Sequence, residues 1–348
     1  MSENESEEEQ QQQIFICADI WHGVFAFLIP FELGLKMALI SDRLDVLVDV
    51  HFKSRKWSLG WMAIRRATDR NGAEIVKYRS DEWLPIPEGP LPDKVIGFEQ
   101  ITISYIEQSV IEFLQRIRRL FGFSGTNVWI HTSAYQSRSW EIICQMIWPL
   151  VSDNICCLHL DSSQLERLRQ FSPAILRNCA NLRSIVTFDF SPVFPAEDNA
   201  GASSNQALVK WLLTSREDGL PKMLHCGSLL AKMEELKGSF VSASEPANFI
   251  IRMYHSPFAG IKPFELKNNW TAEQLTFRLI GGFWLLVRCP IGREENKWAK
   301  WEKEAIELPW CWWSRQWNRI AIDFGDSDIG DGMVEAKAGP SEPNKPKK

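Results

Sequence analysis

Three aspartates near the C-terminal end have the residue type and spacing that could hold a metal ion. Asp326, Asp328 and Asp331 follow the alternating pattern with which a calcium-binding loop begins. The position that would need the chelating glutamate is Lys337, and Asp331 stands where the loop needs a glycine. We therefore expect an exposed acidic turn here, not a calcium site.

Histidine and cysteine lie close together at two points. His159 follows Cys157 by two residues, and His225 adjoins Cys226. A zinc site needs four ligands, usually supplied as spaced pairs, and the chain has no C-x-x-C pair. We expect both histidines to be core or sheet-edge residues, and we expect no bound metal and no cofactor.

No group of residues forms a recognisable catalytic motif. Cys144 lies in an apolar helical segment, whereas a cysteine nucleophile needs a helix start and a neighbouring base. Asp323-Phe324-Gly325 spells the metal-binding motif of protein kinases, but the kinase glycine-rich loop and His-Arg-Asp loop are missing. Neither G-x-S-x-G nor a Walker loop occurs. The sequence favours a binding protein over an enzyme, and turnover that depends on one Cys or His would identify an enzyme.

Tryptophan is frequent, with 16 residues against 4 tyrosines. Six of these tryptophans lie close together near the C-terminal end: Trp298, Trp301, Trp310, Trp312, Trp313 and Trp317. They could form the core of a C-terminal module or an aromatic recognition surface, because tryptophan is enriched in binding hot spots. Our candidates for target binding are Trp298, Trp301, Trp312 and Trp313.

Composition and charge limit the classes of protein. The 348 residues are 45% apolar and 24% charged, which is ordinary for a folded chain. The net charge of −5 disfavours nucleic acid as a partner. No apolar run approaches the ~18 residues of a membrane helix, so we expect no membrane partner. The 8 cysteines show no extracellular spacing framework, which favours a reducing compartment, either cytoplasm or nucleus.

The first part of the chain is expected to be helical. Residues 1–13 form an acidic tail that we expect to be disordered, and residues 14–60 form a helical domain. Ile16, Ile20, Val24 and Leu28 recur at the spacing of one helix face. The next segment carries apolar stripes on two faces, and one small domain cannot cover both. We expect one face to be a docking surface or to be buried against the rest of the chain. Residues 61–95 contain four prolines and are expected to form a stiff connector.

Residues 96–245 alternate short apolar strands with amphipathic helices. The expected strands lie at 101–106, 127–132, 155–160, 182–188 and 222–226. The first four begin about every 27 residues, within the range of leucine-rich repeats. We expect an α/β domain that resembles such a repeat.

Residues 246–332 are expected to form an antiparallel β-rich module. A strand is expected at 249–254, and strands at 277–280 and 283–287 flank Gly281-Gly282, a strong hairpin signal. A helix at 294–305 precedes a closing strand at 318–324. Residues 333–348 form a second tail. The predicted fold class is α+β in several parts: a three-helix unit, an α/β repeat-like middle and a β-rich C-terminal module.

The helical domain resembles an F-box. Ile20, Val24, Phe25 and Leu28 match the first helix of the family pattern. Pro30-x-Glu32-Leu33 matches the second element, and Ile40-Ser41-x-Arg43 matches the third. Ile16-Cys17 stands where the family has Leu-Pro, and Leu44 where an aromatic residue is common.

The last third of the chain is similar to the C-terminal F-box-associated module of the families expanded in nematodes. Segments 248–252, 263–266, 284–290, 298–305 and 317–318 carry this similarity.

The resemblance implies a substrate adaptor of an SCF-type ubiquitin ligase. Its F-box would bind a Skp-type linker protein, and through it a cullin, while the downstream modules capture an unknown protein target. The implied linker-binding residues are Ile16, Ile20, Val24, Leu28, Pro30, Leu33, Leu35 and Ile40. The alternative is a scaffold or effector that keeps the F-box fold but no longer binds the linker, which the missing Leu-Pro favours.

Overall fold

The fold is taken from a computed structural model of the 348-residue chain. It describes residues 16–25, 28, 33–52, 57–78, 83–93, 95–122, 125–227, 229–254, 262–307 and 318–333. The chain forms two compact units. We call residues 1–59 with 89–96 the helical unit, and residues 60–88 with 97–348 the sheet unit.

The helical unit is built from three short helical segments. They are α1 (Ala18–Phe25), η1 (Leu33–Met37) and α3 (Asp42–Phe52), and β1 (Trp57–Ser58) pairs with β5 (Val95–Gly97) beside them. The unit has a core of its own, formed by the buried side chains of Phe25, Leu33, Ala38, Leu44 and Val48. Leu44 and Val48 lie one turn apart and so share a face of α3.

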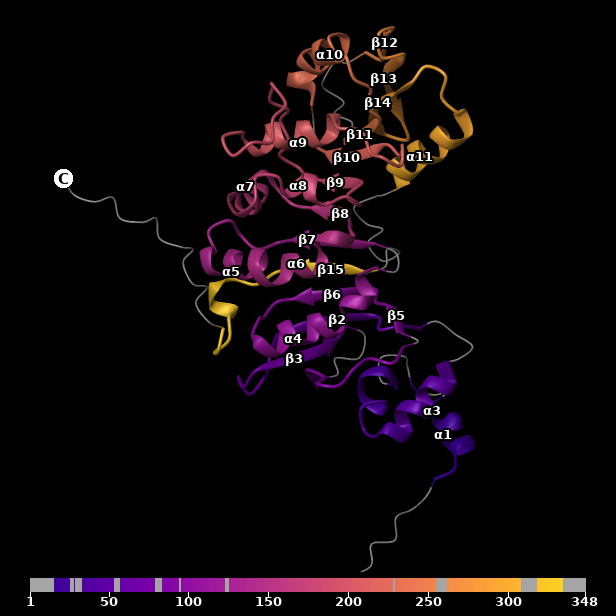
Figure 1. The fold of residues 1–348 in the computed structure, drawn as a ribbon, viewed down its shortest axis with the longest axis vertical. Coiled ribbons are helices and arrows are strands. Elements are labelled where there is room, and N and C mark those ends of the chain that lie inside the picture. The colour runs from indigo at the N-terminus through magenta and orange to yellow at the C-terminus, as the bar shows by residue number, and fades with distance from the viewer. Residues whose placement is uncertain are drawn as a thin grey trace, which may run out of the picture. The chain divides into compact units, whose positions relative to one another are not determined.

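The sheet unit contains one sheet of 13 strands (Figure 1). Its strands, in spatial order, are β12 (Phe264–Asn268), β13 (Glu273–Ile280), β14 (Phe283–Pro290), β11 (Phe249–Tyr254), β10 (Lys222–Cys226), β9 (Ser184–Val186), β8 (Ile155–His159), β7 (Thr126–Ile130), β15 (Arg319–Ile322), β6 (Gln100–Ile103), β2 (Trp61–Arg66), β3 (Ala73–Lys77) and β4 (Trp83–Pro85). The strands from β11 to β2 are parallel, and both ends of the sheet are antiparallel. The prediction of a mixed α and β protein is confirmed.

The central strands align a continuous row of apolar side chains. Val128, Leu158, Ile185, Leu224 and Ile251 occupy matching register positions on β7, β8, β9, β10 and β11, and all five are buried. Parallel strands covered on their faces are typically apolar in this way.

Helices follow most of the parallel strands. The described helical segments of the sheet unit are α4 (Gln108–Arg116), η2 (Arg118–Gly122), α5 (Ser137–Ile142), η3 (Ile143–Ile147), α6 (Trp148–Val151), η4 (Ser152–Asn154), α7 (Ser162–Phe171), α8 (Ile175–Asn178), α9 (Ser204–Leu213), η5 (Leu230–Lys232), α10 (Met233–Val241), α11 (Glu295–Glu307), which follows the antiparallel β14, and η7 (Asp326–Asp328). Capping boxes at Asp161 and Ser203 begin α7 and α9. Leu165 of α7 and Leu208 of α9 lie beside Ile185, so both helices cover that face of the sheet.

Helix α11 packs on the opposite face (Figure 1). Its Trp298 and Ala305 form a buried cluster with Met223 of β10 and Ile250 of β11. These two residues alternate with the row that faces α7 and α9, so they point to the other side of the strands.

The strand near the C-terminal end does not close the antiparallel region. β15 runs parallel between β6 and β7, where Ile320 is in register with Ile101 and Val128. The strand itself was expected, but not its position. Its partners lie roughly two hundred residues earlier in the chain, and no local pattern in the sequence specifies such pairing.

Residues 61–95 differ from the predicted connector. β2 and β3 form an antiparallel pair at one end of the large sheet, and β2 also pairs in parallel with β6. Met62 and Ile64 are fully buried and alternate with half-buried neighbours. This alternation is a strand signal, which the prolines later in the segment had outweighed.

The Gly281-Gly282 hairpin is confirmed. Ile280 of β13 pairs with Phe283 of β14, leaving the two glycines as the turn. Their φ angles are +58° and +82°, a backbone conformation that favours glycine.

The antiparallel end of the sheet buries a charged pair. The Arg288 guanidinium donates to the Glu273 carboxylate at 2.6 and 3.1 Å, and the two side chains are 3% and 1% exposed. Glu273 also accepts from the Ala247 backbone N–H at 2.8 Å. This contact ties β13 and β14 to the start of β11.

None of the described helices has both the length and the apolar character that a bilayer span requires.

Candidate interaction surfaces

The helical unit exposes large apolar side chains in addition to its buried core. Ile20 and Val24 of α1 are 58% and 41% exposed, and Val46 and Val50 of α3 are 61% and 40% exposed. Ile40, between η1 and α3, is 65% exposed. Fifteen large apolar side chains are exposed across the described chain, and these five all lie in a segment of about thirty residues. We call these five the exposed apolar set. Ile20 and Val24 lie one turn apart on α1, and Val46 and Val50 lie one turn apart on α3, so each pair shares a helix face. Contiguous exposed apolar surface is typical of interaction sites.

Some of the linker-binding residues that the F-box resemblance implies are exposed, and others are buried in the core. Ile20, Val24 and Ile40 are exposed, whereas Leu33 is fully buried and belongs to the core of the unit. Ile16 and Leu28 are half-buried, and Leu28 packs against the core. Pro30 and the side chain of Leu35 lie outside the described residues.

Carboxylates are interspersed with the exposed apolar set. Asp42, Asp45 and Asp49 lie on α3, in the same helix as Val46 and Val50. Burial raises the pKa of Asp45, and repulsion from Asp49, Asp42 and Asp93 adds to the effect. The surface of α3 is therefore both apolar and negatively charged.

The sheet unit offers a second surface, on the face opposite α7 and α9. Trp129, His159, Val186, His225 and Arg252 occupy matching positions on five neighbouring strands. They alternate with the apolar row and so point away from α7 and α9. We call these five residues the imidazole row.

Aromatic rings extend the imidazole row toward the ends of the strands. The Trp129 ring lies 3.8 Å from His131 and 4.5 Å from His159, measured between ring centroids, and His159 lies 5.7 Å from Phe188. Farther along the row, the Arg252 guanidinium lies 3.7 Å from the centre of the Phe283 ring. His131, Phe188 and Tyr254 are exposed, so solvent reaches this end of the face.

The histidines of this surface are neutral near pH 7. Burial lowers the pKa of His159 to about 4, with a smaller contribution from His131. Burial also lowers the pKa of His225 to about 3, and Arg252 and His159 add to that shift. Neither ring nitrogen of His225 has a hydrogen-bond partner within the described chain. The expectation that His159 and His225 are core or edge residues is confirmed, since they are 6% and 5% exposed.

Three of the described cysteines are held in their protonated form. Burial raises the pKa of Cys144, Cys157 and Cys179 to about 12, so these thiols stay protonated at neutral pH. Buried protonated thiols are poor nucleophiles and poor metal ligands.

The aspartates with calcium-loop spacing bond to the protein itself. Asp326 accepts from the backbone N–H and the hydroxyl of Ser139, both at 2.8 Å, and Asp328 accepts from the Gly325 backbone N–H at 2.8 Å. Across the described residues, no group of three or more His, Cys, Asp or Glu side chains could hold a metal ion.

The candidate tryptophans lie in different environments. Trp298 is 4% exposed and packs in the core beneath α11, and Trp301 is half-buried against the same cluster. Trp312 and Trp313 lie outside the described residues. Trp298 is therefore a core residue of this region and not part of an exposed recognition surface.

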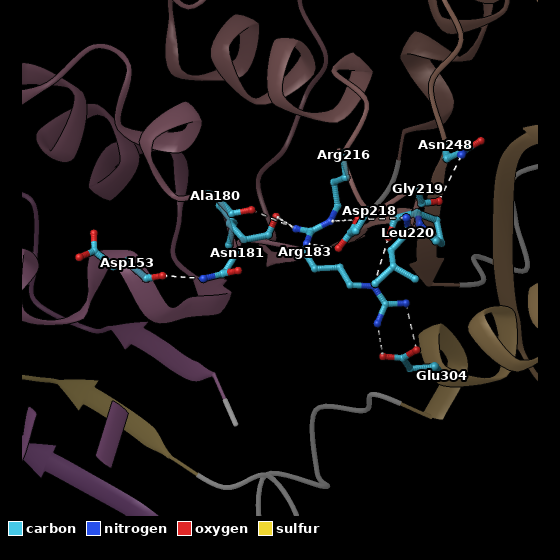
Figure 2. Close-up of polar contacts among 12 residues, drawn as sticks. Asp153, Ala180, Asn181, Arg183, Arg216, Asp218, Gly219, Leu220, Asn248 and Glu304 are labelled. Atoms are coloured by element: carbon cyan, nitrogen blue, oxygen red, sulfur yellow. Dashed lines mark hydrogen bonds and ion pairs between the residues drawn. The ribbon is translucent and has the colours of Figure 1, made fainter. Parts of the chain in front are cut away.

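A network of polar contacts lies where β9, β10 and β11 begin (Figure 2). Arg216 forms two hydrogen bonds with the Asp218 carboxylate, at 2.9 and 2.7 Å, and donates to the Leu182 carbonyl at 2.9 Å. Arg183 forms a similar pair with Glu304 of α11, at 2.9 and 3.1 Å. These contacts join the loop before β10 to the loop before β9, and the start of β9 to α11.

Sequence reasoning found part of these surfaces. Val46 and Val50 were not singled out, although their spacing of four residues on a predicted helix would have placed them together. The imidazole row could not be predicted, because matching positions on separate strands depend on register. Comparison with known proteins adds no assignment: no family model, no curated protein and no solved structure matches this chain.

Proposed function

We propose that this protein is a substrate-recognition adaptor of an SCF-type ubiquitin ligase. The helical unit binds a Skp-type linker protein, and through it a cullin, while the sheet unit binds a protein target inside the cell. The observation that carries the proposal is the exposed apolar set of the helical unit. Such an adaptor catalyses no reaction; it raises the local concentration of its target near a bound ubiquitin-conjugating enzyme.

The helical unit keeps its own core separate from the exposed apolar set. Phe25, Leu44 and Val48 are buried, so α1 and α3 already have a packed side. Val46 and Val50 occupy other faces of α3 and gain nothing from that core. Burying side chains of this size stabilises by about 1.5–3 kcal/mol each, which a partner can supply.

The finer domain organisation is part of the same proposal. We assign α1, η1 and α3 to an F-box-like unit, β6 to β10 with their helices to a repeat-like α/β region, and β11 to β14 to a C-terminal module. In support, β7, β8, β9 and β10 are neighbours in space in the order of the sequence, as in repeat arrays. The imidazole row crosses this region, and its half-buried Trp129 and the neighbouring exposed Phe188 supply aromatic side chains of the kind enriched in interfaces.

The decisive experiment is a calorimetric titration of the full chain with a purified Skp-type linker protein. We expect saturable binding by the wild type. Val24→Asp and Val50→Asp place a charge in the exposed apolar set on α1 and α3 respectively. The variant on the docking helix should bind at least about thirtyfold more weakly, the loss typical of an interface hot spot.

Val241→Asp is the matched control. Val241 lies on α10 and is 64% exposed, so it tests the same substitution at a similar site elsewhere. Its affinity should equal that of the wild type. Absence of linker binding by the wild type would overturn the proposal and favour the scaffold alternative. Equal loss in all three variants would also contradict it, because the effect would not belong to the helical unit.

A further inference from the structure

A cavity of about 840 Å³ lies at the edge of the sheet where β9, β10 and β11 begin. Leu176 of α8 and Ala207 and Trp211 of α9 contribute apolar wall, and Leu182 lines it from the loop before β9. This volume is within the range that accommodates a small organic ligand.

The polar contacts in Figure 2 hold the walls of this cavity in place. Arg216, which also lines it, is fixed by Asp218 and by the Leu182 carbonyl. The Asn248 side chain donates to the Gly219 carbonyl at 3.4 Å and links the loops before β10 and β11. A ligand would therefore enter a preformed site, which lowers the entropic cost of binding.

Lys222 places a buried cation at this cavity. It is the first residue of β10, it is 6% exposed, and it lines the cavity. Its Nζ donates to the Trp211 carbonyl, in the last turn of α9, and lies 5.1 Å from the centre of the Trp211 ring. An ammonium group has three N–H donors, and within the described chain this is its one hydrogen bond.

No carboxylate of the described residues pairs with Lys222. Burial lowers the pKa of Lys222 to about 8, and repulsion from Arg216 adds to the effect. The two arginines that line the cavity differ from it, because Arg177 pairs with Asp198 and Arg216 pairs with Asp218. A buried charge without a counter-charge is costly, and an anion bound beside it would remove that cost.

The remaining titratable groups of the wall shape which anion fits. Lys210 is exposed and adds positive charge, whereas Glu217 and Glu245 are exposed and add negative charge. The two glutamates disfavour a ligand with a second negative group. Burial raises the pKa of Cys179 to about 12, so this thiol stays neutral.

We propose that this cavity binds a small organic monocarboxylate, whose carboxylate accepts hydrogen bonds from the Lys222 ammonium while its apolar part lies against the half-buried side chains of Pro173 and Leu213. The site is independent of linker binding by the helical unit.

The test uses the full chain and 1-naphthoate as probe, with 1-naphthalenemethanol as its uncharged analogue. At about pH 7 the carboxylate should bind at least about tenfold more tightly than the alcohol, the worth of one charged hydrogen bond. At about pH 9.5 this preference should disappear, because Lys222 is then neutral. Equal affinity for acid and alcohol at both pH values, or no saturable binding of the acid, would overturn the proposal.

Lys222→Met should reduce naphthoate affinity at least about tenfold, and the matched control Lys210→Met less than about threefold. If Lys222→Met does not fold, the comparison of acid with alcohol and the labelling of Lys222 in the wild type still test the proposal. Naphthoate should slow acetylation of Lys222 by acetic anhydride, read by mass spectrometry, and leave the exposed Lys300 of α11 unaffected. Unchanged labelling of Lys222 at saturating naphthoate would contradict the proposal.

Discussion

The two compact units differ in the side chains that mark them: one buries a charged pair, and the other exposes apolar side chains. At its antiparallel end the sheet unit buries charge and satisfies it internally, as the Arg288–Glu273 pair shows. The helical unit leaves Ile20 and Ile40 in solvent although each would gain from burial. The buried pair is therefore satisfied within the fold, whereas the helical unit has apolar surface that a partner can cover. The following predictions, from the largest expected effect to the smallest, test this difference.

Glu273→Ala should lower the free energy of unfolding of the sheet unit by about 3–5 kcal/mol, because it leaves Arg288 buried without its counter-charge. Urea unfolding measures the loss. Glu265→Ala is the control, since its pair with Lys267 spans 3.6 Å between exposed side chains. It should cost less than about 1 kcal/mol. Equal losses would show that burial does not govern these pairs.

Leu33→Ala should destabilise the helical unit by about 2–5 kcal/mol, because Leu33 is fully buried in its core. Ile40→Ala should change that stability by less than about 0.5 kcal/mol, because Ile40 is exposed. Hydrogen exchange of the α3 amides measures the stability of the helical unit, and exchange of the β10 amides measures the stability of the sheet unit. Loss of protection in β10 on Leu33→Ala would show that the two units unfold together.

Acid should act on the two units in opposite directions. In the sheet unit, burial holds the pKa of His159 near about 4, below its unfolded value of about 6.5. The unfolded chain therefore binds more protons, and stability falls as the pH drops from about 6.5 to about 4, by up to about 3 kcal/mol. In the helical unit the pKa of Asp45 is raised, so the folded form takes up the proton more readily. That unit should gain stability as the pH falls through the raised pKa.

Hydrogen exchange across this pH range, corrected for the intrinsic rates, measures both effects. His159→Phe should reduce the acid loss in β10 and leave the part that comes from His225, whose pKa is also lowered. Asp45→Asn should abolish the gain in α3. A loss of stability in both units as the pH falls would contradict this prediction.

Gly282→Ala should cost about 1 kcal/mol, because its φ of +82° strains any residue with a Cβ although no atom lies within 4 Å of the added group. Gly292→Ala is matched to it, since it also meets no atom within 4 Å and has no φ in the strained range. Thermal unfolding should therefore separate the two variants. Identical midpoints would mean that the hairpin turn relaxes without cost.

Local patterns predicted the elements of this fold well. The strands Lys222–Cys226 and Phe249–Tyr254 begin and end where the sequence placed them, and α11 and the Gly281-Gly282 hairpin also agree. Each of these carries a signal within a few residues: a run of apolar residues, a helical period or a glycine pair.

The arrangement of these elements in space could not be predicted as well from the sequence. β15 pairs with strands far away in sequence, and the imidazole row depends on register across five strands. Of the candidate linker residues, Leu33 and Ile40 are both apolar and lie in similar sequence contexts, yet one is buried and the other exposed. Burial of this kind is set by tertiary packing, which apolar character alone does not specify.

The place of β15 in the sheet has a consequence for synthesis of the chain. The pairing edges of β6 and β7 stay open until Ile322 has left the ribosome, because β15 is the strand that joins them. We expect the two parts of the sheet to wait as unjoined intermediates with exposed strand edges, which are prone to association with other chains. Released chains that end after Glu307 should therefore stay sensitive to protease between β6 and β7, and the released full chain should be resistant. Resistance in the shorter chains would show that the sheet closes without its central strand.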